Sequence, residues 1–239
     1  MEGLILFFLA LILLFAGASV AFTFAGISIF VGVLVLGLDL FAFLPYRIMS
    51  IMENTTLMSI PMFIFMGIVL QKTGLAERLL ESSAKLFGSM SGGVAISTII
   101  VGALLAASTG VVGASVVAMG VISLPVMLKN NYHQPTAAGV ICASGTLGQI
   151  IPPSIILIIL GDVMGLPVGD LFKAAVIPGM MLIGVYVLYI LVLSYVKPDF
   201  CPPIPVEEDK MTILKQAAKD IVPPLLLIVV VLGSIFTGI

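Results

Sequence analysis

Charged residues, cysteine, histidine and tryptophan are all scarce in this sequence. Only 9% of the 239 residues are charged, whereas a soluble domain carries about 25%. Two cysteines, Cys142 and Cys201, make no disulfide framework, and the single histidine, His133, makes a zinc cluster untenable. A net charge of −2 argues against nucleic acid as a partner. These scarcities predict an integral membrane protein whose surroundings are the lipid bilayer, with no cofactor and no nucleic acid partner.

Hydrophobic residues make up 61% of the chain and gather in long uncharged runs. The first run extends over 36 residues, from Gly3 to Leu38. As a single helix it would be about 54 Å long, well beyond the roughly 30 Å hydrocarbon core of a bilayer. Two alternatives remain open: one long tilted helix that protrudes, or two short helices that meet near residues 17–19.

Further membrane segments are predicted on both sides of a more polar stretch. Residues 57–71 and 174–196 are apolar enough to span a membrane. Residues 71–91 combine basic residues with leucines on one face, which predicts a helix along the membrane surface. After an acidic loop, MTILKQAAKD is amphipathic, and Pro223 and Pro224 begin a last apolar run without a polar end. The chain is therefore expected to be truncated at its C-terminus.

The region between Lys85 and Lys129 has 43 uncharged residues with a polar break in the middle, ASTGVVGAS at residues 107–115. The arms on either side, residues 92–108 and 111–128, are each short for a full span. They fit a re-entrant helical hairpin whose tip reaches partway into the membrane. They fit two thin spans almost equally well, because both routes return the chain to the same side.

A second polar break, GTLGQIIPPS at residues 145–154, interrupts the next apolar run. Because prolines lack a backbone donor, residues 136–148 and 155–161 are predicted as two halves of one discontinuous helix. Freed backbone groups are tolerated in a membrane only against protein or a polar ligand. The carbonyl end of the first half suits a cation such as Na⁺, and the N-terminal end of the second, near Ser154, suits an anion. The alternative is a proline kink whose freed groups are satisfied by neighbouring helices.

Several of these stretches together resemble one family. The long apolar N-terminus, LLAASTGVVGASVVAMG and HQPTAAGVICASGTLGQIIPPSI are similar to the large membrane subunit of tripartite ATP-independent periplasmic (TRAP) transporters. The resemblance runs through the whole chain, and GQIIPPS after an STG-containing hairpin is its most specific element. It implies an all-α, polytopic membrane protein of the ion-transporter kind, with a re-entrant helical hairpin at 92–128 and a discontinuous transmembrane helix.

The resemblance also implies a function. In that family, a periplasmic substrate-binding protein delivers a small organic anion, typically a carboxylate or sialic acid, to the membrane subunits. Uptake is driven by a Na⁺ gradient, and the large subunit works as an elevator beside a small membrane subunit. The chain is accordingly expected to be a multi-pass protein of the bacterial inner membrane and not an enzyme, with Na⁺ as the coupling ion.

The family's binding positions carry over to matching residues of this sequence. The hairpin tip would be Ser108–Gly110, and the unwound helix would run from Ser144 to Pro153. Na⁺ is expected near Ser108, Gly145 and Thr146. The full set of expected substrate- or ion-binding residues is Ser108, Thr109, Gly110, Ser115, Ser144, Gly145, Thr146, Gly148, Gln149, Pro152, Pro153 and Ser154.

Three regions are expected along the chain. Residues 1–91 supply scaffold-type helices and a connecting arm, residues 92–172 a transport-type region with the hairpin and a broken helix at 136–169, and residues 173–239 further scaffold-type helices. Family members are nearly twice this length and carry a second, inverted half. Since a site between inverted repeats needs both halves, this one is expected to depend on a missing C-terminal half or on a second chain that supplies it.

Two other functional classes remain as alternatives. Another Na⁺- or H⁺-coupled anion carrier, without a binding protein, would share the mechanism. A non-transporting membrane scaffold or a passive channel also fits a half-length chain. An intramembrane enzyme fits poorly, because the deep segments offer Ser and Thr but no Asp, Glu, Lys or His to activate them.

Overall fold

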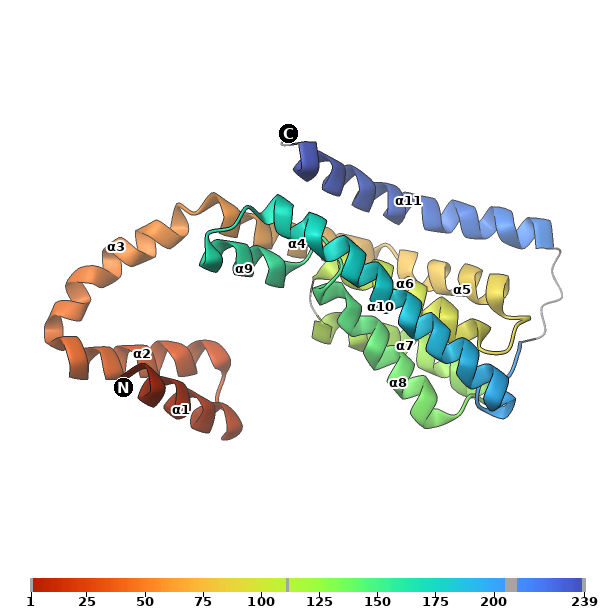
Figure 1. The fold of residues 1–239 in the computed structure, drawn as a ribbon, viewed down its shortest axis with the longest axis horizontal. Coiled ribbons are helices and arrows are strands. Elements are labelled where there is room, and N and C mark those ends of the chain that lie inside the picture. The colour runs from red at the N-terminus through yellow and green to blue at the C-terminus, as the bar shows by residue number, and fades with distance from the viewer. Residues whose placement is uncertain (1, 111, 205–209, 238–239) are drawn as a thin grey trace. The chain divides into compact units, whose positions relative to one another are not determined.

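The computed structural model describes residues 2–110, 112–204 and 210–237, and every regular element in these ranges is a helix (Figure 1). The predicted all-α class is confirmed. Contacts divide the chain into two compact units, Met1–Thr55 and Thr56–Ile239.

The N-terminal unit consists of apolar helices separated by short breaks. α1 spans Glu2–Phe15, α2 Val20–Leu36, the 3-10 helix η1 Gly37–Asp39, and α3 Leu40–Met52. Gly17, between α1 and α2, has a φ of 88°, a left-handed conformation that glycine adopts at little cost and that ends a helix. The first uncharged run therefore forms two short helices, which pack against each other.

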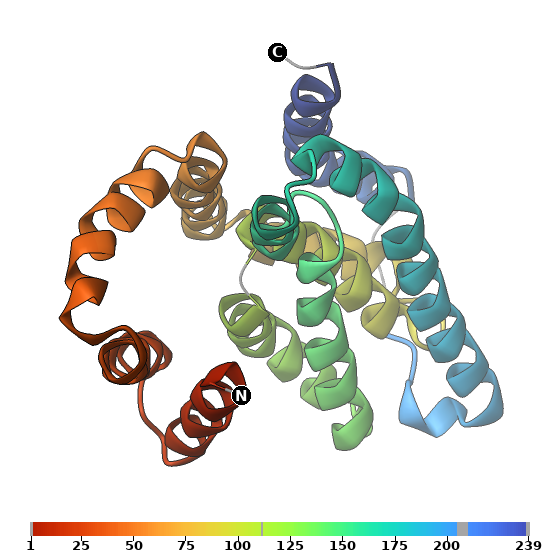
Figure 2. The same ribbon diagram turned by 60° about the vertical axis from the view of Figure 1, so that its left-hand side comes forward.

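The second unit is built around a central hairpin of helices. From its start, the elements are α4 (Thr55–Lys72), α5 (Leu75–Phe87), α6 (Gly93–Thr109), α7 (Val112–Lys129), α8 (Gln134–Thr146), η2 (Leu147–Gln149), α9 (Ile155–Met164), α10 (Val168–Val196), η3 (Pro198–Phe200) and α11 (Lys210–Thr237). Figure 2 shows the short helices in the middle of this unit, with the long helix α10 along their side.

Helix α6 is the core of the second unit. It packs against α5, α7, α8 and α10, and Val94, Ala95 and Val101 are completely buried. The predicted arms at 92–108 and 111–128 correspond closely to α6 and α7. By length and composition α7 can cross a membrane, whereas α6 is shorter. A re-entrant path for this hairpin stays a prediction.

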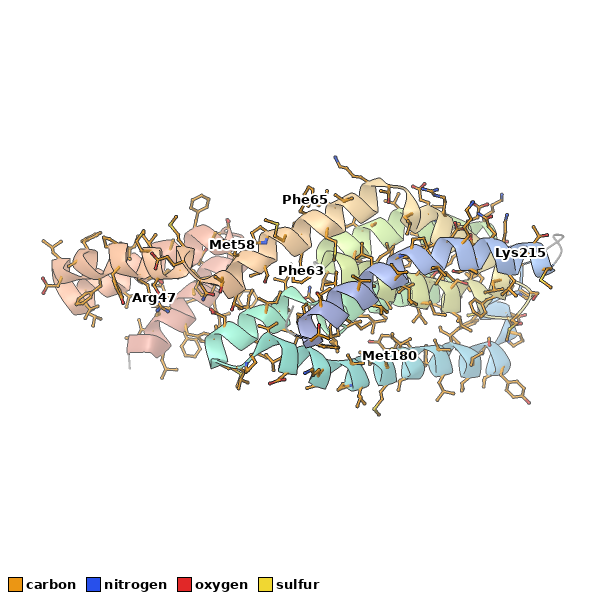
Figure 3. All side chains as sticks on the ribbon, turned by 90° about the horizontal axis from the view of Figure 1, so that it is seen from above. Arg47, Met58, Phe63, Phe65, Met180 and Lys215 are labelled. Carbon is orange, nitrogen blue, oxygen red and sulfur yellow. The ribbon has the colours of Figure 1, made fainter. Side chains whose placement is uncertain are left out.

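The described residues contain four helices long and apolar enough to span a membrane: Val20–Asp39, Val112–Lys129, Val168–Val196 and Met211–Thr237. Large apolar side chains point outward from them and from α4. Phe65 and Met180, which are 66% and 62% exposed, are two that Figure 3 labels. Such extensive apolar exposure requires a hydrocarbon environment. The chain is a multi-pass membrane protein.

The amphipathic stretches pair with each other. α5, the predicted surface helix, packs along α11, and the hydroxyl of Ser82 donates a hydrogen bond to the Asp220 carboxylate between them. α11 joins the amphipathic stretch to the last apolar run and continues through Pro223 and Pro224. The carbonyls that lose their donors lie four residues earlier, at Lys219 and Asp220, in the polar part of the helix.

The loop after α10 is fastened to the rest of the unit through its backbone. Three hydrogen bonds between main-chain groups hold it: Gly92 N to Cys201 O at 2.9 Å, Ile204 N to Gly88 O at 2.7 Å, and His133 N to Phe200 O at 3.0 Å. The end of α10 is thereby tied to the start of α6 and to the turn between α7 and α8.

Candidate functional site

The tip of the α6–α7 hairpin is a tight glycine turn. Gly110 ends α6 with a φ of 62°, and its N–H donates to the Ala106 carbonyl at 3.0 Å. This left-handed capping conformation is the one that favours glycine. Ser115, in the first turns of α7, is 2% exposed. The side chains of Ser108 and Thr109 lie outside the described part of the structure.

The predicted break in the discontinuous helix is confirmed. α8 ends at Thr146, η2 adds one tight turn, and residues 150–154 are irregular before α9 begins at Ile155. Pro152 and Pro153 are buried, and the peptide between them is cis. The Ser154 hydroxyl donates to the Gln149 carbonyl at 2.7 Å and accepts from the N–H of Leu157 at 3.4 Å, so it caps α9.

The tip of the α6–α7 hairpin and the helix break at residues 147–154 are in direct contact. The side-chain amide of Gln149 donates to the Gly110 carbonyl at 2.9 Å, although 39 residues separate them. The other atom of this amide, Oε1, is buried and has no hydrogen-bond partner among the described residues. A buried carbonyl oxygen without a donor is costly, at about 1–3 kcal/mol, unless a ligand satisfies it.

Glycines let the backbones approach closely around this junction. A Cβ on Gly148 would overlap the Ala106 carbonyl of α6, and one on Gly145 would overlap Val116 of α7. A Cβ on Gly102 would lie 2.5 Å from Ser144 Cβ. The break is therefore held against α6 and α7 by contacts that any larger side chain would prevent.

Two of the expected hydroxyls are engaged within their own helix. Ser144 is fully buried, and its hydroxyl donates to the Ile141 carbonyl at 2.9 Å. The Thr146 hydroxyl donates to the Ala143 carbonyl at 2.8 Å, and this side chain is exposed. The structure thus brings Gly110, Gln149 and Ser154 together by hydrogen bonds, and it does not direct Thr146 toward them.

The local electrostatics come from helix ends. The C-termini of α6 and α8 lie at this junction and carry partial negative charge, while α7 and α9 begin there with partial positive charge. The available ligands are carbonyl, amide and hydroxyl oxygens, which suit a hard cation. The arrangement can hold a small cation beside carbonyls and an anion beside N–H groups.

Sequence reasoning identified both polar breaks and missed the residues that join them. Ala106, Val116 and Ile155 contribute the facing surfaces, and Ile155 Cγ1 would lie 2.9 Å from a Cβ on Gly110. These are ordinary apolar residues in apolar helices, so the sequence does not indicate which residues they contact.

Comparison with known proteins gives a consistent result. The family described as tripartite ATP-independent periplasmic transporter, DctM component, matches residues 5–239. The C4-dicarboxylate TRAP transporter large permease protein DctM of Pseudomonas aeruginosa is 33% identical over 196 residues, 82% of this chain and 45% of that protein. Its counterpart in Vibrio cholerae is 35% identical over 184 residues, 77% of this chain and 40% of that protein.

A relative with a different substrate name matches a longer stretch. The sialic acid TRAP transporter large permease protein SiaM of Vibrio cholerae is 27% identical over 232 residues, 95% of this chain and 52% of that protein. The chain thus spans about half the length of the curated relatives it matches.

Proposed function

Since the chain belongs to the DctM component family of the tripartite ATP-independent periplasmic transporters, we propose that it supplies one half of a Na⁺-coupled carrier for a small organic anion. Relatives named for C4-dicarboxylates, sialic acid and 2,3-diketo-L-gulonate support an acidic organic substrate. The remaining half comes from further sequence or from a second chain. A carrier of this kind changes no covalent bond in its substrate, so its residues bind and move rather than catalyse.

The observation that carries the proposal is the junction of Gly110 and Gln149. It places a buried, unpartnered Oε1 next to the carbonyl ends of α6 and α8. Na⁺ bound there would satisfy this oxygen and face the partial negative charge of both helix ends. The expected Na⁺ position near Ser108 and Gly145 is part of the same proposal, with Gln149 in place of Thr146, whose hydroxyl donates to the Ala143 carbonyl.

Partners and location follow from the family in the same way. A small membrane subunit completes the scaffold, and a periplasmic binding protein delivers the anion to a carrier in the bacterial inner membrane. Residues 92–172 act as the moving part of an elevator, between scaffold-type regions at 1–91 and 173–239. The glycine contacts between α6, α7 and the helix break support this assignment, because they make the site one packed body.

The test is Na⁺-dependent uptake of labelled organic acids in proteoliposomes. The chain alone is compared with the chain plus its C-terminal half, the small subunit and a substrate-loaded binding protein. We expect uptake only in the complete mixture, driven by an inward Na⁺ gradient. Uptake by the chain alone would contradict the half-carrier, and uptake unaffected by Na⁺ would contradict the coupling ion.

Gln149→Leu tests the junction itself, because leucine keeps the approximate size and removes both amide atoms. In the complete mixture we expect the Na⁺ concentration for half-maximal uptake to rise at least tenfold, equivalent to about 1.4 kcal/mol. Gln134→Leu is the matched control, since Gln134 is exposed at the other end of α8. An identical Na⁺ dependence of the Gln149 variant and the wild type would refute the ligand role.

A further inference from the structure

A groove of about 670 Å³ runs between α8 and α10, away from the helix break. Its walls are mostly apolar and include Val140 of α8 together with Val185 and Tyr189 of α10. Ile99 of α6 also lines it. A groove of this size lies within the range of ligand sites, roughly 300–1,000 Å³.

One end of the groove carries polar and cationic groups. The His133 ring stacks on Phe200 with centroids 4.1 Å apart, and Lys197 Nζ lies 4.9 Å from the centroid of the same ring. All three residues line the groove. The Phe200 ring therefore contacts both an imidazole and an ammonium group.

These two groups have spare capacity to bind an anion. The ion pairs formed among the described residues join Lys85 to Glu81 and Lys173 to Asp170, which leaves Lys197 without a carboxylate partner there. His133 Nδ1 lies 3.1 Å from the Thr136 hydroxyl. When that hydroxyl donates to Nδ1, the neutral ring carries its proton on Nε2, which is then a free donor.

The position of the groove relative to the membrane decides what can occupy it. Lys197 directly follows Val196, the last residue of the 29-residue apolar helix α10. It therefore lies where the hydrocarbon ends, and the groove runs from there along the apolar part of the helix. Val185 and Tyr189, on the groove wall, are 56% and 61% exposed, so the groove is open along its side.

We propose that the groove between α8 and α10 is a binding site for an anionic phospholipid. The phosphate binds Lys197 and His133, and one acyl chain lies in the apolar groove along Val140 and Val185. Basic sites between membrane helices bind anionic headgroups in this manner. This site is distinct from the junction of Gly110 and Gln149 and goes beyond the proposed transport function.

Occupation of the groove also has a mechanical effect. α8 leads directly into the helix break, and α10 follows α9 on its far side. A lipid that contacts both helices favours the arrangement in which they lie side by side. Binding of the lipid is then coupled to the stability of the segment that holds the candidate transport site.

The test measures lipid binding to the chain in detergent micelles by native mass spectrometry and titration. Phosphatidylglycerol is compared with phosphatidylcholine of the same acyl chains, and glycerol phosphate is added as a soluble competitor. We expect tighter binding of phosphatidylglycerol and no competition by glycerol phosphate, because the acyl chain is needed. Equal affinity for the two lipids, or displacement by the soluble phosphate, would overturn the proposal.

Variants separate the two parts of the site. Lys197→Gln is expected to weaken phosphatidylglycerol binding about fivefold, the typical contribution of one basic residue near an anionic membrane surface, and to leave phosphatidylcholine binding unchanged. Lys215→Gln on α11 is the matched control, since this exposed lysine lies outside the groove (Figure 3). If both lysine variants bind phosphatidylglycerol equally, the charge at the groove end has no specific role.

Gly139→Leu tests the apolar part without changing charge. Gly139 lines the groove, and a Cβ there meets nothing within 4 Å, so leucine fills the groove and leaves the helix packing intact. We expect reduced binding of both lipids. Unchanged lipid binding by a folded Gly139 variant, or a groove found occupied by a helix of another subunit, would refute the lipid assignment.

Discussion

Gly102→Ala is expected to destabilise the chain by forcing α6 and α8 apart. The new Cβ would lie 2.5 Å from Ser144 Cβ and 2.6 Å from Ser144 Oγ. Carbon atoms in contact lie about 3.5–4.0 Å apart, so the two helices must separate by roughly 1 Å. Rotation of the Ser144 side chain gives no relief, because its Cβ is fixed by the backbone.

The magnitude follows from two opposing effects. Overpacking a core costs about 1–3 kcal/mol, and a clash between two Cβ atoms is at the upper end of this range. The higher helix propensity of alanine offsets about 1 kcal/mol of this cost. The net loss of stability is therefore about 2 kcal/mol, which lowers the unfolding midpoint by about 4–8 °C in a chain of this size.

The chain carries a suitable reporter of unfolding. Cys201 is completely buried, whereas Cys142 is exposed. In a Cys142→Ser background, a thiol-reactive fluorophore therefore labels Cys201 only as the protein unfolds on heating in detergent. Gly120→Ala is the control, because a Cβ on this α7 residue meets nothing within 4 Å, and its midpoint should stay the same or rise.

A double substitution separates a specific contact from general damage. Ser144→Gly removes the facing Cβ. When it is combined with Gly102→Ala, only one of the two facing residues of α6 and α8 carries a side chain, as in the wild type. We expect the double variant to be more stable than the sum of the single effects predicts, by about 2–3 kcal/mol. If the two effects add within about 0.5 kcal/mol, α6 and α8 do not cross here and the reasoning fails.

Two further predictions concern buried polar side chains of the second unit. Burial raises the pKa of Tyr132 to about 12, and the nearby Cys201 thiol is a second cause. The contribution of the neutral phenol to the free energy of unfolding is therefore complete below pH 10 and is lost as the pH rises toward 12. Tyrosinate absorbance should show a late titration that is lost in Tyr132→Phe, and the same late titration in this variant as in the wild type would contradict the prediction. Ser82→Ala removes the hydrogen bond to Asp220 and should cost about 1 kcal/mol in thermal unfolding, whereas an unchanged midpoint would show that α5 and α11 pair without it.

The secondary structure was largely predictable because polar breaks are visible in an apolar sequence. The hairpin arms and the break at 145–154 follow from glycine, serine and proline positions, and the helices agree with them within a few residues. The stretch from Gly3 to Leu38 was ambiguous, because a charge-free run carries no boundary marker. The continuity of α11 through Pro223 and Pro224 was not predicted, because prolines inside a sequence usually mark the end of a helix.

The site was predictable as a list of residues and not as an arrangement. Gly110 and Gln149 were both expected, yet their hydrogen bond depends on how α8 crosses α6. That crossing is set by glycines facing Ala106, Val116 and Ser144, and a sequence does not state which surfaces face each other. The orientation of Thr146 was equally unpredictable. Its hydroxyl was expected at the site, and it donates to the Ala143 carbonyl of its own helix.

The loop after α10 has a consequence for how force passes through the molecule. Its three attachments at Gly92, Gly88 and His133 use only main-chain groups, so no change of side chain at the acceptor positions deletes them. A pull on the end of α10 is transmitted to the base of the hairpin and to the α7–α8 turn simultaneously. An insertion or deletion within 197–199 would shift the register of all three attachments at once, and this segment therefore tolerates changes of residue type better than changes of length.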